Sequence, residues 1–193
     1  MKLNQQPALK KAILELPQAE KDKLLVRLIN KDAMLIKQLH FQLLEDEDDL
    51  DRRTEELLSK LRQLIDRAAG YIPNINQFRN ADNLMGELKY GSGLINEHAA
   101  ITKDKMSEVR CRLLLVSQSF AHFDELFEEH LYQRNDRLLK YQASRVKYIL
   151  GKYDKLHEDL QFEFRDELND ALAFAHQSGL RPYMVALGLP NEI

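Results

Sequence analysis

The sequence is poor in glycine and proline, and it contains a single cysteine. Seven glycines and five prolines are spread over 193 residues, and Val, Ile and Thr are sparse beside Leu, Glu, Lys and Asp. Glycine and proline disfavour helix interiors, whereas β-branched residues favour strands. The composition therefore favours helix over strand and predicts an all-α fold. Apolar residues make up 44% of the chain, which excludes disorder as its default state.

The lone cysteine, Cys111, cannot form a disulfide within the chain, and no cysteine-based metal set is present. It predicts a structural thiol in a reducing compartment. The first residues lack the apolar core of a signal peptide. No apolar run approaches the roughly 20 residues that a membrane span needs. We therefore expect a cytoplasmic protein with no membrane partner.

Residues 1–45 show short helical periodicities joined by tight connections. Pro7 suits a first helical turn, Pro17 separates two apolar segments, and Asp32 suits the N-cap of a third helix. Connections this short predict helical hairpins. The run over residues 45–56 follows, with eight acidic residues in twelve. It lacks the glycine of a calcium-binding EF-hand loop, so we interpret it as the start of a helix, whose dipole such acids complement.

The second half of the chain carries the strongest helical pattern. A continuous apolar stripe predicts one helix over about residues 104–134. The three phenylalanines of this stripe are expected in the core. The stripe consists of Leu113, Val116, Phe120, Phe123, Phe127 and Leu131. Asn135 and Asp136 can start the next helix. A further helix is expected from Asp154 to Ser178, with Gly179 at its C-terminus. Gly86, Gly91 and Gly93 weaken the helix over 82–100 and indicate a bend or a close helix contact.

These patterns predict short N-terminal helical hairpins packed against a bundle of longer antiparallel helices, in a solenoid-like or a globular arrangement. The hairpins occupy residues 1–69, a loosely helical connector with glycines occupies 70–102, and the long-helix bundle with a docked C-terminal tail occupies 103–193. We expect the three segments to form one compact unit.

Candidate metal and catalytic groups are isolated. Asp154, His157 and Glu158 form one loose cluster, and a second consists of His122, Glu125 and Glu129. A ferritin-like centre needs Glu-x-x-His pairs on two helices, and only Asp154-x-x-His157 approaches that spacing. Both clusters are therefore interpreted as solvated faces. The segment GELKYGSG lacks the closing Lys-Ser/Thr of a phosphate-binding loop, and no nucleophile elbow is present. We assign no cofactor, no metal and no catalytic residue.

One basic segment stands out in a chain whose net charge is −3. On a helix over residues 134–155, the apolar residues fall on one side and seven Lys or Arg on the other, with Tyr141 and Tyr148 among them. Such cations could neutralise phosphates while the tyrosines stack on bases. Alternatively, the tyrosines pack under another helix, or the cations pair with the acids of residues 156–170. The candidate binding residues are Arg134, Arg137, Tyr141, Arg145, Tyr148 and Lys152.

The function that we predict is a non-catalytic intracellular interaction or regulatory module with a protein partner, because no chemical group converges in the pattern. The alternative is nucleic-acid binding through residues 134–155. The third possibility is an enzyme whose carboxylate or metal site the sequence does not reveal.

Overall fold

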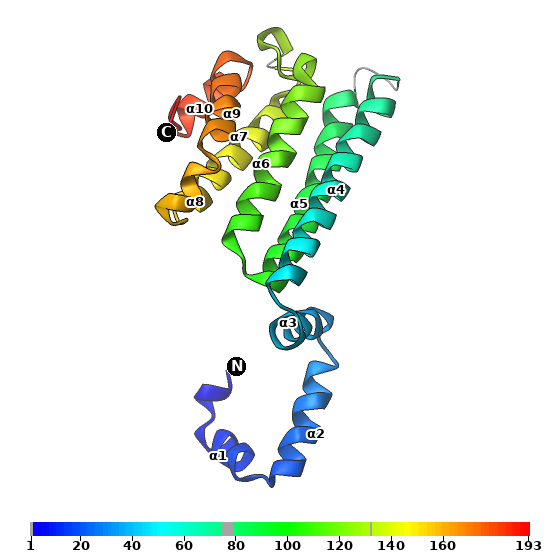
Figure 1. The fold of residues 1–193 in the computed structure, drawn as a ribbon, viewed down its shortest axis with the longest axis vertical. Helices are drawn as coiled ribbons and strands as arrows, with labels where there is room; N and C mark the ends of the chain where they lie inside the picture. Colours follow the sequence, from blue (N-terminus) through cyan, green and yellow to red (C-terminus); the bar gives the residue numbers. More distant parts are fainter. Residues whose placement is uncertain (1, 75–78, 132) are drawn as a thin grey trace. The chain divides into compact units, whose positions relative to one another are not determined.

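The computed structural model describes residues 2–74, 79–131 and 133–193, and within these ranges every regular element is helical (Figure 1). The predicted all-α fold is confirmed. The chain divides into two compact units, residues 1–46 and residues 47–193. The predicted division placed residues 47–69 with the N-terminal hairpins, whereas in the structure their helix belongs to the larger unit. Each unit is described by itself below.

The N-terminal unit contains a 3₁₀ turn, η1 (Leu3–Gln5), and three short helices. These are α1 (Pro7–Glu15), α2 (Gln18–Ile29) and α3 (Ala33–Leu44). Pro7 occupies the first turn of α1, and the Asp32 carboxylate accepts hydrogen bonds of 3.0 Å from the backbone amides of Met34 and Leu35. The predicted positions of Pro7 and Asp32 are therefore confirmed. None of residues 2–46 is buried.

The larger unit begins with α4 (Glu47–Tyr71), which starts inside the acidic run as predicted. Its first turn carries Glu47, Asp48 and Asp49, whose charges complement the positive end of the helix dipole. The helix buries its leucine face and ends in the 3₁₀ turn η2 (Ile72–Asn74). Residues 75–78 of the predicted connector lie outside the described residues.

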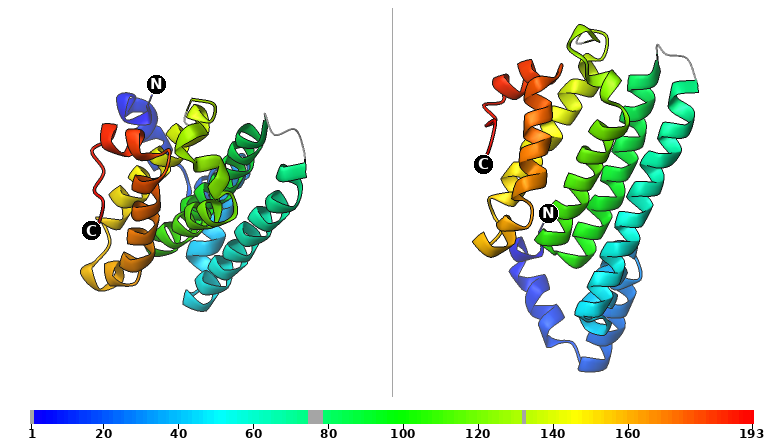
Figure 2. Two further views of the ribbon diagram at one scale, coloured as in Figure 1. Left: turned by 90° about the horizontal axis from the view of Figure 1, so that it is seen from above. Right: turned by 45° about the horizontal axis from the view of Figure 1, so that its top comes forward.

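Two long helices follow, α5 (Asn80–Thr102) and α6 (Lys105–His122), and both contact α4 (Figure 2). The predicted loose connector is thus a regular helix over most of its length. Gly86 and Gly93 are exposed and do not break it, whereas Gly91 is buried between helices. A Cβ at position 91 would lie 3.0 Å from Cδ2 of Leu115 and 3.1 Å from Cδ2 of Leu64. Gly91 is therefore the close helix contact that the sequence indicated.

The predicted helix over 104–134 is wrong beyond His122, where α6 ends. Two 3₁₀ turns replace its last part, η4 (Asp124–Phe127) and η5 (Glu129–Leu131). The predicted core role of the phenylalanines is nevertheless confirmed, because Phe120, Phe123 and Phe127 are all buried. A turn of about three residues keeps apolar side chains on one side, so the stripe fits both conformations.

The C-terminal part contains α7 (Asp136–Tyr153), α8 (Glu158–Phe162), α9 (Arg165–Gln177) and α10 (Arg181–Ala186). The single helix predicted from Asp154 is in fact two helices, α8 and α9, and Asp154 is the C-cap of α7 instead of the start of the next helix. Gly179 follows α9, and its amide donates a 2.6 Å hydrogen bond to the Phe127 carbonyl oxygen. A Cβ at this glycine would lie 2.9 Å from the same oxygen, so the backbone approach requires glycine.

Helix α6 lies at the centre of the larger unit, in contact with α4, α5, α7 and α9 (Figures 1 and 2). Its buried face includes Val109, Leu113 and Val116. Helix α7 packs on both α5 and α6, and this arrangement forms the pocket described next. Across the described residues, no helix combines the length and the hydropathy that a membrane crossing would need.

Candidate functional site: the pocket between α5, α6 and α7

The six predicted site residues do not share one environment. Arg134 lies before the start of α7, and Arg137 is exposed, with its Nη1 atom 3.4 Å from Oδ1 of Asp82, which is also exposed. Tyr148 is exposed at its edge, with 40% of its surface accessible. Tyr141, Arg145 and Lys152 are half-buried. The basic face of α7 is therefore only partly a free surface.

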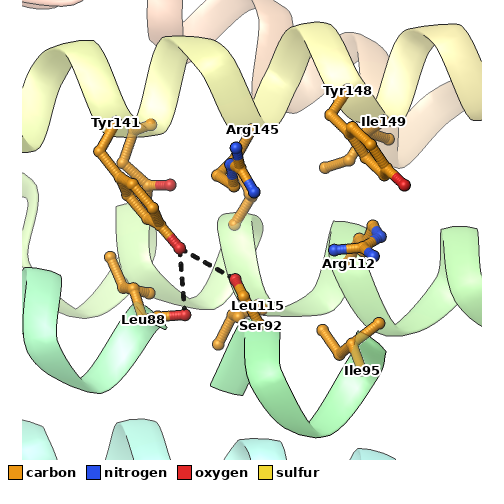
Figure 3. A pocket seen from close by; sticks show the side chains of 11 residues that line it. Leu88, Ser92, Ile95, Arg112, Leu115, Tyr141, Arg145, Tyr148 and Ile149 are labelled. Carbon is orange, nitrogen blue, oxygen red and sulfur yellow. Dashed lines mark hydrogen bonds between the residues drawn. The ribbon is translucent and has the colours of Figure 1, made fainter. Parts of the chain in front are cut away.

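Tyr141 reaches from α7 to α5. Its hydroxyl lies 2.9 Å from the Ser92 hydroxyl and 3.3 Å from the Leu88 carbonyl oxygen (Figure 3). Ser92 is itself buried one residue after the close helix contact at Gly91. For this tyrosine, the interpretation that it packs under another helix is confirmed.

Arg145 lies between the two tyrosines (Figure 3). Its guanidinium carbon is 5.1 Å from the centroid of the Tyr141 ring and 5.8 Å from that of Tyr148. The guanidinium of Arg112, on α6, lies 4.5 Å from the Tyr148 ring, and Nζ of Lys152 lies 5.3 Å from it. Cation–π contacts at these distances are favourable. The cationic side chains also occupy the space beside the tyrosine rings that a stacked base would need.

Glu108 on α6 holds two of these cations. Its Oε1 atom accepts hydrogen bonds of 2.9 and 2.8 Å from Nε and Nη2 of Arg112, and its Oε2 atom accepts one of 2.8 Å from Nζ of Lys152. Nη2 of Arg112 also donates to Oδ1 of Asn96 at 2.7 Å. The side chains of Glu108 and Arg112 are each only 6% exposed. They form a buried ion pair, and these hydrogen bonds offset part of the cost of removing its charges from water.

The electrostatics of this cluster favour the charged carboxylate. Burial by itself would raise the pKa of Glu108, but the hydrogen bonds from Lys152 and Arg112 outweigh it and hold this pKa below its usual value. The hydrogen bond to Glu108 in turn raises the pKa of Lys152. Both groups are therefore charged at neutral pH.

Sequence reasoning identified the cations of α7 but missed Glu108 and Arg112. Their spacing of four residues on α6 is typical of a helical ion pair and was a usable signal. Pairing of the α7 cations with acids of residues 156–170 was one of the alternatives that the sequence left open. In the structure Glu163 pairs with Arg110 of α6 instead, at 3.0 Å. The α7 cations form ion pairs with Glu108, Asp82 and Asp136.

The pocket enclosed by these side chains has a charged rim and an apolar floor. Leu88 and Ile95 of α5 and Leu115 of α6 line the floor, and Ile149 of α7 lies opposite them beside Tyr148 (Figure 3). Arg112, Arg145 and the two tyrosines line much of the remainder, together with Ser92, Val116 and Gln142. The space left between them accommodates about one water molecule.

The candidate metal and nucleophilic groups remain apart from this pocket. Within the described ranges, no three His, Cys, Asp or Glu side chains gather to hold a metal ion. His157 caps the start of α8, and Nε2 of His122 lies 4.0 Å from an Asp66 carboxylate oxygen. Cys111 is fully buried in α6, and burial raises the pKa of its thiol to about 12. It is a thiol at neutral pH, as a structural role requires.

Comparison of the chain with protein-family models, with curated proteins and with solved structures finds no match in any of the three. The function is therefore inferred from the chain's own surfaces.

Proposed function

We propose that this protein is a non-catalytic interaction module whose helices α1–α3 bind a protein partner. One observation carries the proposal: none of residues 2–46 is buried, although the segment is helical and rich in leucine. The large apolar side chains that it exposes are Leu3, Leu9, Leu14, Leu25, Val26, Leu28, Ile36, Leu43 and Leu44.

Three short helices without a core are not stable alone. Ordering the backbone costs about 1–2 kcal/mol per residue. Isolated helices shorter than about 12–15 residues are marginal in water, and the three here have 9, 12 and 12 residues. Full burial of one Leu, Ile or Val contributes about 1.5–3 kcal/mol. A partner that covers this surface would therefore supply the core that the unit lacks.

The charge of the segment indicates what kind of protein surface fits. Residues 7–44 contain seven Lys or Arg and four Asp or Glu, in a chain whose net charge is −3. One of the four acids, Asp32, is engaged as the cap of α3. A partner with an apolar centre and an acidic rim would match both the leucines and the surplus cations.

Nucleic-acid binding through residues 134–155 is the weaker alternative. Base stacking would need free faces on Tyr141 and Tyr148, and Arg145 and Arg112 lie against those rings. The most exposed cations could still contact phosphates, but phosphate contacts alone give salt-sensitive, unspecific binding.

A cytoplasmic location is part of the same proposal. It is supported by the single thiol, which is buried and has no second cysteine to pair with.

Site-specific photo-crosslinking in the native cell tests the proposal. A benzoylphenylalanine at position 25 should crosslink to a discrete acidic protein, whereas the same group at Tyr90, an exposed position in the larger unit, should not. The purified partner should then slow amide exchange in α1–α3 of the parent chain.

The double substitution Leu25→Glu with Leu28→Glu should abolish that protection, because it places charges in the apolar contact. The matched control Ala19→Glu adds a charge to the same helix without removing a large apolar side chain and should retain binding. Crosslinks only between two copies of this chain, or a purified partner that leaves exchange in α1–α3 unchanged, would overturn the proposal.

A further inference from the structure

The side chains around Tyr148, which lines the pocket between α5, α6 and α7, carry more positive charge than their one carboxylate balances. Arg112, Arg145 and Lys152 all lie within 6 Å of the Tyr148 ring. Glu108 is the one carboxylate, among the described residues, that forms an ion pair with any of the three, and it contacts Arg112 and Lys152. The local surplus is therefore two positive charges.

Arg145 is the unpaired member of this group. Within the described part of the chain it forms no ion pair, and its Nε atom is buried without a hydrogen-bond acceptor. A buried donor left without an acceptor is destabilising, and more so when it is charged. The Nε–H group of Arg145 therefore lacks an acceptor, and a group bound in the pocket could provide one.

We propose that this pocket binds a phosphoryl group, either as inorganic phosphate or on a small organic phosphate. A phosphate monoester carries a charge of about −1.5 to −2 at pH 7 and three acceptor oxygens, which matches a surplus of two. A carboxylate would leave one positive charge unbalanced. Planar guanidinium groups such as those of Arg145 and Arg112 are well suited to hydrogen-bond phosphate oxygens.

The apolar lining of the pocket favours an organic phosphate over the inorganic ion. Leu88, Ile95, Leu115 and Ile149 can contact a ring or an alkyl group but offer nothing to a free ion. The present space holds about one water molecule. The ligand therefore enters only when the half-exposed side chains of Arg145 and Tyr148 change rotamer, a common response to binding.

Titration of the full-length, ¹⁵N-labelled protein tests this inference. Phenyl phosphate, inorganic phosphate and benzoate are added separately at constant ionic strength, and the Nε–H resonances of Arg145 and Arg112 are followed. Phenyl phosphate should shift both resonances and bind roughly tenfold or more tightly than benzoate, which has the same ring but one charge. Inorganic phosphate should compete with it at the same resonances.

Arg145→Gln should weaken phenyl phosphate binding roughly tenfold or more, because it removes a charge-assisted hydrogen bond. Arg137→Gln is the matched control, since it removes one cation from the same helix away from the pocket, and should change affinity less than about twofold. No shift of the Arg145 Nε–H with either phosphate up to about 10 mM, equal affinity for benzoate, or equal binding by Arg145→Gln would show that the pocket holds water only.

Discussion

Glu108 is the residue on which the charge arrangement of the larger unit depends. Its carboxylate is buried and joins Arg112 of its own helix to Lys152 of α7. Removal of one partner from a buried ion pair leaves the other charge without compensation. This lowers stability more than replacement of both partners by apolar residues does.

Glu108→Gln should therefore lower the free energy of unfolding at pH 7 by about 3 kcal/mol, because the buried Arg112 guanidinium loses its counter-charge. Urea-induced unfolding measures the loss. Glu163→Gln is a suitable control, since this acid pairs with Arg110 at the surface and should cost less than about 1 kcal/mol. Equal effects of the two substitutions would show that the Glu108 pair contributes little.

The same residue predicts a pH dependence. The folded-state pKa of Glu108 is lowered, so its charged form is stabilised by folding. This contribution is fully present above the unfolded-state pKa of about 4.3 and is lost as the pH falls through the folded-state value. The difference in stability between the parent and Glu108→Gln should narrow as the pH is lowered below about 4.3. A difference that stays constant down to the acid transition would contradict the lowered pKa.

Phe123 provides the corresponding test of the core. It is fully buried at the point where α6 ends. Phe123→Ala should cost about 3–5 kcal/mol of unfolding free energy, as expected for a cavity left by a buried phenylalanine. Phe162→Ala, at a position that is 77% exposed, should change stability by less than about 0.5 kcal/mol. Thermal or urea unfolding separates the two variants.

At the scale of elements, helix contacts decide where glycine matters. Gly91 sits where α5 touches Leu115 of α6 and Leu64 of α4, whereas Gly93 of the same helix faces open space. Alanine is favoured over glycine inside a helix by about 0.5–1 kcal/mol. An alanine at position 93 should provide this stabilisation. At position 91 the added Cβ would lie 3.0–3.2 Å from side-chain carbons of Leu115 and Leu64, and these close contacts oppose the stabilisation.

We therefore expect Gly93→Ala to stabilise the protein by roughly 0.5–1 kcal/mol and Gly91→Ala to be less stable than Gly93→Ala by about 1 kcal/mol or more. Urea unfolding of both variants and the parent gives the comparison. Equal stabilisation by both substitutions would mean that α5 and α6 can separate at Gly91 without cost.

The elements also show what the sequence predicts and what it leaves open. The cap at Asp32, Pro7 in the first turn of α1, the acidic start of α4 and the buried phenylalanines follow from local chemistry, and all are confirmed. The residue at which α6 ends cannot be predicted from local chemistry, because an apolar stripe fits an α-helix and a 3₁₀ turn alike. That turn is fixed by distant partners, such as the amide of Gly179 on the Phe127 carbonyl.

The candidate pocket, too, is only partly predictable from the sequence. The cations and tyrosines of α7 are visible as one face of a single helix. Which of them are free depends on α5 and α6, which supply Ser92, Glu108 and Arg112. Residues 88 to 149 approach one another only in the folded bundle, so no local pattern reveals the pocket.

At the scale of the whole molecule, the two units differ in how their apolar residues are used. Residues 47–193 bury a continuous hydrophobic core, whereas the described residues of the N-terminal unit bury none. Only the larger unit therefore has the means to be stable by its own contacts. The central claim is that α1–α3 obtain a core from a protein partner.

Amide hydrogen exchange of the purified full-length chain, at a concentration where sedimentation shows a monomer, tests this claim most directly. The account predicts that residues 7–44 exchange at rates close to those of an unfolded chain, while the buried helices α4–α7 exchange only through much rarer opening. Addition of the partner should slow exchange in residues 7–44 and leave α4–α7 unchanged. Protection of residues 7–44 equal to that of α4–α7 in the isolated monomer would contradict it, because the N-terminal unit would then be stable without a partner.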